Sequence, residues 1–330
     1  MLDHGGRLRE AAAHYDIPLA DWLDLSTGIN PQGWPVPPLP AAAWQRLPED
    51  NDGLEAAAAA YYGNANLRPL AGSKAAIQWL PALLPRAAVA CIAPLYNEHP
   101  QAWQRAGHKL RFLQNATLPR ALAAATPYVL LCNPNNPTAD RHPRELAVDA
   151  AAQLKKRGGW LIVDEAFIDA TPEHSLTPLA GTADAPNLIV FRSLGKFFGL
   201  AGLRVGFLFA APELLAKMAE AIGPWSIAGP SRAAATLALC DSAWQATTRQ
   251  RLLADSERLR QLLAPLGEVK APPLFATLNA AAPAELHEHL ARHAILTRRY
   301  EANPLLRVGL PPDEIGWQRL EQSLAEWKPA

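Results

Sequence analysis

The sequence of 330 residues has few cysteines and no long apolar run. Cys91, Cys132 and Cys240 are widely separated, and no C-x-x-C or other metal-ligand spacing occurs. We therefore expect no metal centre, and we expect a reduced, cytoplasmic setting with Cys91 and Cys132 as buried free thiols. No apolar stretch reaches the ~18 residues of a membrane span, and the N-terminal MLDHGGRLREAAAHYD lacks the apolar core of a signal peptide.

The sequence also lacks an excess of charge of either sign. Lys+Arg and Asp+Glu are both 31, so the formal net charge is zero. This balance argues against an extended surface for nucleic acid or anionic membranes, although it allows a local basic pocket. GKFFGLAG is not a phosphate-binding P-loop, and no G-x-G-x-x-G follows a strand, so we expect no nucleotide site.

Helical segments alternate with short apolar segments between residues 73 and 210. We expect helices at 73–84, with Ser73 as N-cap, and at 100–106 and 144–157. The predicted strands are 89–93, 108–113, 128–132, 160–164, 188–192 and 204–210. Short, continuously apolar strands between helices indicate an α/β fold with a mostly parallel sheet covered on both faces.

The pattern changes after residue 224. One long helix, or two that nearly abut, is expected over 230–263, followed by strands at 275–279, 294–297 and 305–310 and helices at 284–292 and 312–327. We therefore divide the chain into an N-terminal arm (1–33), a large domain (34–224) and a small α+β domain (225–330). The arm ends in the extended LSTGINPQG, and we expect it to pack on the small domain and the active site.

Lys196, in the run SLGKFFGLAGLR, follows the end of a predicted strand. A lysine in such a turn is usually a solvated surface charge. Here Ser193 and Arg204 flank it and supply a hydroxyl and a guanidinium group for phosphate oxygens. A lysine buried near other cations has a free amine, which can form an imine with an aldehyde.

Asp164 is at the carboxyl end of the predicted strand WLIVD, where open α/β sheets bind their ligands. An N-cap or a loop ion pair is the alternative interpretation of this residue. Beside Lys196, its carboxylate can pair with a cationic ring nitrogen, which keeps the ring able to accept electrons from a bond broken at Cα.

Other polar residues follow neighbouring strands. Gly72, Ser73 and Lys74 open a predicted helix, whose N–H groups and dipole favour a phosphate. NPNNPT is a turn in which Asn136 can donate to a ring oxygen, and Tyr96 is either a core tyrosine or a stacking partner for the ring. Pyridoxal phosphate presents an aldehyde, a ring nitrogen, a ring oxygen and a phosphate, so we predict it as the cofactor.

Further arginines can bind a substrate. Arg307, on a predicted strand, is either a surface ion pair or a bidentate clamp for a carboxylate. Arg298 and Arg299 can reach a second anion such as a phosphate. The segment from His4 to Arg7, with its two glycines, is a candidate anion-binding nest.

The chain resembles the fold-type-I pyridoxal-phosphate enzymes, specifically the histidinol-phosphate aminotransferase branch, over about residues 3–327. Within that branch it is most similar to the threonine-phosphate decarboxylases of cobalamin biosynthesis. The stretches that carry this similarity are HGGRLREAA, LSTGINPQG, AGSKAAIQWLP, APLYNEH, NPNNPT, VDEAFID, SLGKFFGLAGLRVG and ILTRRYE.

The resemblance implies a seven-stranded large domain, a homodimer and the cofactor roles given above. It also implies that Arg307 binds the substrate α-carboxylate, and that the substrate phosphate lies among His4, Gly6, Asn30 and Arg298. Two positions depart from the relatives. Phe167 stands where the aminotransferases usually carry a tyrosine, and Leu47 where relatives often place a tyrosine that reaches the partner subunit's cofactor phosphate.

Two activities remain open. The first is decarboxylation of L-threonine O-3-phosphate to (R)-1-amino-2-propanol O-2-phosphate, which Phe167 favours. The second is transamination of histidinol phosphate or a similar amino acid, which differs only in the Cα bond that is held perpendicular to the ring. A cofactor-sensing regulator would need an added basic DNA-binding module, which this sequence lacks.

Overall fold

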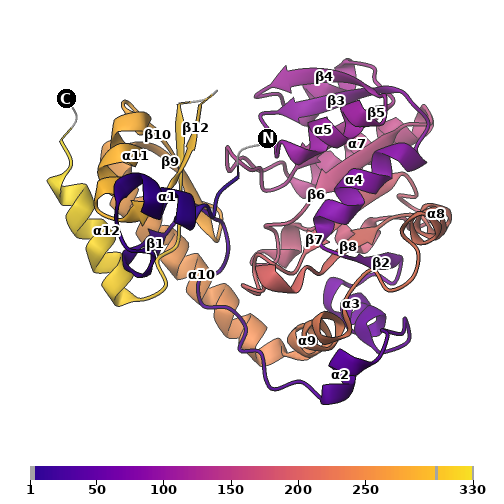
Figure 1. Cartoon of the computed structure of the whole chain (residues 1–330). Coiled ribbons are helices and arrows are strands. Elements are labelled where there is room, and N and C mark those ends of the chain that lie inside the picture. The colour runs from indigo at the N-terminus through magenta and orange to yellow at the C-terminus, as the bar shows by residue number, and fades with distance from the viewer. Residues whose placement is uncertain (1–3, 302–303, 329–330) are drawn as a thin grey trace. The chain divides into compact units, whose positions relative to one another are not determined.

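A seven-stranded sheet forms the centre of the larger of two compact units in the computed structural model, which describes residues 4–301 and 304–328 (Figure 1). The strand order is β2-β8-β7-β6-β5-β3-β4. Only β8 runs antiparallel to its neighbours. The strands are β2 (Leu67–Leu70), β3 (Ala88–Ala93), β4 (Lys109–Gln114), β5 (Tyr128–Cys132), β6 (Trp160–Asp164), β7 (Leu188–Ser193) and β8 (Gly206–Phe209). The predicted mostly parallel sheet is confirmed.

Helices bury the apolar faces of this sheet. Side chains of α4, α5 and α8 form one core with alternate residues of the strands, including Leu130, Ile162 and Phe191. Successive strand residues point to opposite faces. Leu131 and Val163 therefore belong to the other face, and α7 contacts β6. The helices of this unit are α2 (Ala41–Gln45), α3 (Leu54–Tyr62), α4 (Ser73–Leu83), α5 (Glu98–Arg105), α6 (Leu118–Ala123), α7 (Arg144–Lys156), α8 (Pro212–Ile222) and α9 (Gly229–Cys240).

The second compact unit combines residues 1–33, 137–139 and 247–330. It contains a four-stranded antiparallel sheet in the order β12-β13-β10-β9, and β1 pairs in parallel with β11. The strands are β1 (Leu23–Asp24), β9 (Gly267–Lys270), β10 (Phe275–Ala280), β11 (Ile295–Leu296), β12 (Arg298–Tyr300) and β13 (Leu305–Gly309). The helices are α1 (Leu8–Tyr15), α10 (Ser242–Leu263), α11 (Pro283–Arg292) and α12 (Glu314–Glu326).

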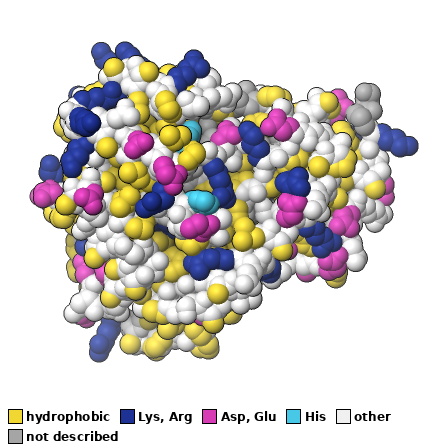
Figure 2. All heavy atoms as spheres, turned by 180° about the vertical axis from the view of Figure 1, so that it is seen from behind, with side chains coloured by type: hydrophobic (Ala, Val, Ile, Leu, Met, Phe, Trp, Pro, Cys, Tyr) yellow, Lys and Arg dark blue, Asp and Glu magenta, His cyan; other side chains and the backbone are white. Residues whose placement is uncertain are grey.

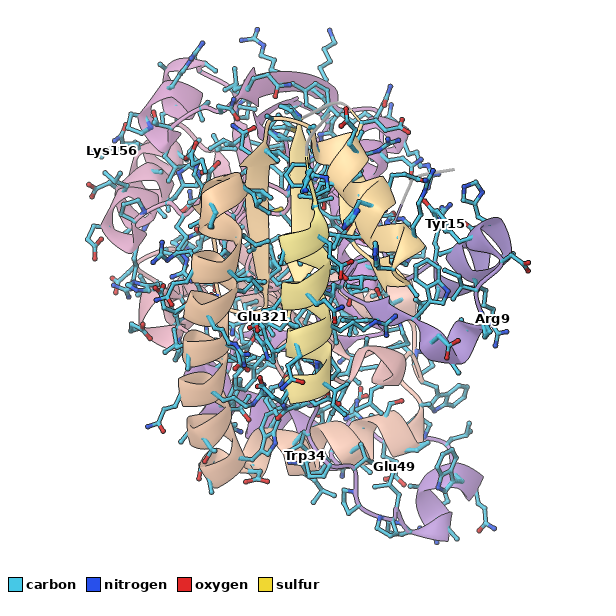
Figure 3. All side chains as sticks on the ribbon, turned by 90° about the vertical axis from the view of Figure 1, so that its left-hand side faces the viewer. Arg9, Tyr15, Trp34, Glu49, Lys156 and Glu321 are labelled. Atoms are coloured by element: carbon cyan, nitrogen blue, oxygen red, sulfur yellow. The ribbon has the colours of Figure 1, made fainter. Side chains whose placement is uncertain are left out.

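Ion pairs join α10 to α12. Arg258 contacts Glu314 at 2.7 Å and Glu321 at 2.9 Å, and Figure 3 shows the two helices side by side with Glu321 labelled on α12. The helical segment expected over 230–263 is two helices, because the Asp241 carboxylate accepts a hydrogen bond from the Trp244 N–H and begins α10. The compact units divide at residue 246, whereas the sequence boundary was drawn at 224, because α9 packs on α2 and α3.

Several helix starts differ from the sequence expectation, and the differences at α4 and α5 change residues of the candidate site. Ser73 is the first residue of α4, and Gly72 occupies the N-cap position with no side-chain cap. Helix α5 begins at Glu98 rather than at Pro100, which brings Glu98 and His99 into its first turn. The helix α1 was not predicted at all.

Surface charge is mixed on the face shown in Figure 2, where basic and acidic side chains are interspersed among apolar ones. This agrees with the zero formal net charge. Among the residues that the structure describes, no helix has both the length and the apolar character needed to cross a bilayer.

Candidate active site

A candidate phosphate site lies where the N-terminus of α4 meets the start of β8. A Cβ atom added to Gly206 would lie 2.3 Å from the Ser73 backbone nitrogen, so only glycine allows this approach. A Cβ atom on Gly72, whose φ is +74°, would lie 2.5 Å from Nη2 of Arg204. Ser193 is the register partner of Gly206. The structure thus brings Gly72, Ser73, Ser193 and Arg204 together, and their N–H, hydroxyl and guanidinium groups suit an anion.

Lys74 has a different side-chain partner. Its Nζ lies 2.9 Å from Oε1 of Glu98, whose side chain is buried. This ion pair links the first turn of α4 to the first turn of α5. A contact between Lys74 and a phosphate would therefore come from its main-chain N–H.

Asp164 is held at the end of β6 by two partners. Its Oδ1 accepts a hydrogen bond from the Ala166 N–H at 3.0 Å, and its Oδ2 lies 2.8 Å from Nε2 of His99. Both side chains are buried, His99 completely. The sequence analysis missed His99 because it began the helix at Pro100. The position of APLYNEH directly after a strand end was the signal that could have identified it.

Tyr96 and Asn136 meet beside Asp164 around Cys132. Burial raises the pKa of the Cys132 thiol well above its usual value, and the backbone N–H groups of Tyr96 and Asn136 face its sulfur. Cys132 is in register with Asp164 on the neighbouring strand. Burial, followed by the nearby carboxylates of Glu98 and Asp164, raises the pKa of Tyr96 to about 12, so the phenol is neutral at physiological pH.

Lys196 is half-buried, and its Nζ lies 5.3 Å from the centre of the Phe167 ring. Phe167 is itself buried. Phe167 stands where the aminotransferases usually carry a tyrosine, so the lysine faces an apolar ring without a hydroxyl at this position. Leu47, the other departure, is exposed.

One group of potential metal ligands occurs among the described residues. The ligand atoms of His99, Cys132 and Asp164 all lie within 4.8 Å of one another. Two ligands about 2.0–2.1 Å from one tetrahedral ion would lie roughly 3.3 Å apart. The 2.8 Å between His99 and Asp164 is instead the distance of a hydrogen bond.

The second compact unit carries a pair of buried arginines. Arg298 on β12 is the register partner of Arg307 on β13, so their side chains leave the same face of the sheet. Both are buried, whereas Arg299 is exposed on the opposite face and pairs with Glu301 at 3.4 Å. Of the two candidates Arg298 and Arg299, only Arg298 lies beside Arg307. Two guanidinium groups at opposite positions suit a ligand with more than one negative charge.

Ser26 connects Arg307 to the N-terminal segment. The Ser26 carbonyl accepts a hydrogen bond from Nη2 of Arg307 at 2.7 Å, and its hydroxyl accepts one from the Gly6 N–H at 2.7 Å. A Cβ atom added to Gly5 would lie 2.4 Å from the Ser26 carbonyl oxygen. Gly5 and Gly6 are thereby held at Ser26, whose carbonyl contacts Arg307, and His4 directly precedes Gly5 in the sequence. Ser26 was not among the predicted site residues.

Asn30 is buried and its amide is oriented by two donors. Its Oδ1 accepts hydrogen bonds from the Gln32 N–H at 3.1 Å and from Nη2 of Arg251 at 2.8 Å. Because Oδ1 faces Gln32 and Arg251, the Asn30 amide nitrogen, which is a donor, points away from these two residues. Arg251 was not singled out from the sequence.

Comparison with known proteins gives consistent matches. The model of the family described as Aminotransferase class I and II matches residues 44–300. A threonine-phosphate decarboxylase of Pseudomonas aeruginosa is 50% identical over 99% of this chain and 98% of its own. Another threonine-phosphate decarboxylase, of Sinorhizobium sp, is 42% identical over 98% and 97%.

Solved structures share the fold. A histidinol-phosphate aminotransferase from Sinorhizobium meliloti in complex with pyridoxal-5'-phosphate aligns with a TM-score of 0.83 and 21% identity, covering 98% of this chain and 95% of that one. An L-threonine-O-3-phosphate decarboxylase from Porphyromonas gingivalis aligns with a TM-score of 0.77 and 19% identity, covering 91% and 98%.

Proposed function

Because the chain belongs to the class I and II aminotransferase family, we propose that it is a pyridoxal-phosphate-dependent enzyme that decarboxylates L-threonine O-3-phosphate to (R)-1-amino-2-propanol O-2-phosphate. The observation that carries this proposal is the 50% and 42% identity, over nearly the whole chain, to two threonine-phosphate decarboxylases. The product would enter cobalamin biosynthesis, as the sequence resemblance implies.

The residues of the larger unit fit the cofactor. Ser193, Arg204 and the N-terminus of α4 at Gly72 would hold its phosphate, and Asp164 would pair with its ring nitrogen. Asn136 would donate to the ring oxygen, and Tyr96 would contact the ring. Bound pyridoxal phosphate supplies an aldehyde that condenses with amines and a cationic ring that accepts electrons when a bond at Cα breaks. Lys196 would hold the aldehyde until the substrate amine replaces it. We assign the return of a proton to Cα to the amine of Lys196 as well.

The residues of the smaller unit would bind the substrate. Arg307 would take the α-carboxylate, and Arg298, with His4, Gly6 and Asn30, would take the phosphate. The cross-strand position of the two buried arginines supports this assignment, because register partners in a sheet direct their side chains, and here two guanidinium groups, to the same face.

Phe167 supports decarboxylation over transamination. Its ring lies over Lys196 without a hydroxyl, so the lysine has no phenol from this position to share its proton. Transamination of histidinol phosphate is the second candidate, because a histidinol-phosphate aminotransferase has the same fold.

The test is incubation of the cofactor-loaded protein with L-threonine O-3-phosphate and no keto acid, with CO2 and aminopropanol phosphate followed by mass spectrometry. Both products are expected, and none from Lys196→Ala, which should also lose the visible absorbance of the lysine-bound cofactor. Conversion of the cofactor to its amine form by histidinol phosphate, without CO2, would assign the aminotransferase instead.

We also propose a cytoplasmic homodimer. The cysteines are free, which suits a reducing compartment. Large apolar side chains are exposed on and beside α2 and α9, which pack on each other: Trp44, Leu47 and Leu237. Exposed apolar groups of this kind are typical of a surface that is covered by a second subunit.

A further inference from the structure

Arg192 is a buried arginine on β7 that the proposed reaction does not use. Its side chain is 2% exposed, and its guanidinium group lies between two buried carboxylates. Nη1 donates to Oε2 of Glu165 at 3.3 Å, and Nη2 donates to Oδ1 of Asp169 at 2.8 Å. Breaking a buried ion pair leaves an uncompensated charge, which is strongly unfavourable. The two carboxylates are therefore firmly held by this one side chain.

Other contacts keep the guanidinium group itself in place. Nη1 also donates to the hydroxyls of Ser175 and Thr177, at 2.9 and 3.0 Å. The guanidinium carbon lies 4.5 Å from the centre of the Tyr62 ring. Both hydroxyls in turn donate to Oε2 of Glu165, at 2.5 and 2.9 Å. Arg192 is thus a fixed point to which the segment after β6 is attached.

The two carboxylates flank Phe167 in the sequence, one two residues before it and the other two residues after it. They delimit a turn, 165–169, that is closed by a backbone hydrogen bond of 3.3 Å between its first and fourth residues. The ring of Phe167 is buried at the middle of this turn, and its centre lies 5.3 Å from Nζ of Lys196. Because Arg192 holds both ends of the turn, the place of the ring beside the lysine depends on Arg192.

The ring limits where the lysine amine can go, because an aromatic face attracts an ammonium group. In the proposed reaction, Lys196 returns a proton to Cα after CO2 has left, which releases aminopropanol phosphate and leaves the cofactor as its aldehyde. A proton delivered instead to the former aldehyde carbon of the cofactor leads, after hydrolysis, to 2-hydroxypropanal phosphate and the amine form of the cofactor. The position of the amine therefore decides between the two products.

We propose that Arg192 is a positioning residue, which holds the turn 165–169 at both ends and so keeps the Phe167 ring against Lys196 and the lysine proton directed at Cα. This inference rests on the proposed function and on the role assigned there to Lys196. It requires that Arg192 act through Phe167. Changing either residue should then have the same consequence, and changing both should add nothing.

The first experiment follows turnover of L-threonine O-3-phosphate without a keto acid. Arg192→Lys keeps the charge but loses the fork that reaches both carboxylates. Phe167→Leu keeps an apolar side chain but removes the ring. Each change is expected to raise the ratio of 2-hydroxypropanal phosphate to aminopropanol phosphate, measured by mass spectrometry, by about three- to tenfold, as expected for a lost cation–π contact. The double variant should show the ratio of the single variants, whereas independent residues would multiply their effects.

The second experiment uses no substrate, so it does not depend on the reaction. Hydroxylamine removes the visible absorbance of the lysine-bound cofactor, and the Phe167 ring shields that lysine from solvent. The rate should rise about three- to tenfold in each single variant and no further in the double variant. If the unmodified protein releases no CO2 from L-threonine O-3-phosphate, the proposed decarboxylation is refuted, and the hydroxylamine rate then tests the role of Arg192 by itself.

Arg232 provides the matched control. It is also buried, and its guanidinium group pairs with Asp52 at 2.6 Å and with Glu55 at 2.9 Å, neither of which is a proposed site residue. Arg232→Lys should lower the melting temperature while the product ratio and the hydroxylamine rate stay unchanged. If Arg192→Lys behaves in the same way, its role is structural only and the inference is overturned. Multiplied effects in the double variant would overturn it as well.

A second variant of the same ion pair serves if Arg192→Lys does not fold. Asp169→Asn keeps the shape of the carboxylate and an acceptor oxygen, but it removes the charge that faces the guanidinium group. It should raise the product ratio and the hydroxylamine rate in the same direction. A folded Asp169→Asn protein in which neither changes would refute the inference.

Discussion

At the scale of single residues, the site is defined by which side chains share a face. Arg298 and Arg299 are adjacent in the sequence and chemically identical, yet only Arg298 is buried beside Arg307. A single side chain also distinguishes this protein from the aminotransferases, which usually carry a tyrosine at the position of Phe167. Its apolar ring leaves the Lys196 amine without a neighbouring phenol at that position.

The two neighbouring arginines give a matched test of substrate binding. Arg298→Gln should raise the KM for L-threonine O-3-phosphate by roughly 10- to 100-fold, because it removes a charge-assisted hydrogen bond to an anion. Arg299→Gln should leave KM within about twofold, since surface ion pairs contribute little. Steady-state kinetics of the two variants checks this, and equal effects would contradict the assignment of the phosphate to Arg298.

At the scale of elements, the phosphate site depends on how closely β8 approaches α4. Gly206→Ala should weaken pyridoxal-phosphate binding and destabilise the protein by about 1–3 kcal/mol, because its Cβ atom would overlap the Ser73 nitrogen. Gly202→Ala is the control, since a Cβ atom there meets nothing within 4 Å. Cofactor titration and thermal unfolding provide the measurements. A Gly206→Ala variant as tight-binding as Gly202→Ala would show that the two elements do not form the site.

Helices α1 and α11 are joined by a hydrogen bond that depends on pH. The Tyr15 hydroxyl donates to Glu288 at 2.7 Å, and burial together with this bond raises the pKa of Tyr15 from 10.0 to about 12. The folded state therefore holds the phenolic proton more tightly than the unfolded state. This contribution to stability is complete below pH 10 and is lost as the pH rises toward 12.

Tyr15→Phe should accordingly be less stable than the unmodified protein at pH 8, and the difference should shrink between pH 10 and 12. Urea unfolding followed across this range measures it. A difference that stays constant with pH would mean that the hydrogen bond to Glu288 does not form.

At the scale of the whole molecule, we expect assembly through the apolar surface at α2 and α9. Trp44→Asp should convert the dimer to a monomer, because it places a charge in the proposed interface. Trp79→Asp, on α4, replaces another exposed tryptophan of the same unit and should not affect assembly. Light scattering after gel filtration distinguishes the two states. Dimers of equal stability in both variants would place the interface on another surface.

Much of the larger unit was predictable because its strands are continuous apolar segments. The run YVLLC is a strand with the predicted bounds, and WLIVD likewise ends at Asp164. Parallel strands end at one edge of a sheet, so residues that follow such strands are predicted to gather there. Ser193, Asp164 and Lys196 were predicted as site residues in this way. The helix α1 was not, because nothing marks its first residue apart from the preceding glycines.

The sequence by itself determined the order of the strands along the chain, the residues at their ends and the chemistry that these residues can perform. Only the tertiary structure decided which partners they have, because those partners come from distant segments. His99 meets Asp164 from 65 residues away, and Ser26 meets Arg307 from 281 residues away. Local patterns predict the direction of a side chain within its own element. A contact between elements depends in addition on where helices begin and on strand register. A shift of one or two residues in either changes which side chains meet.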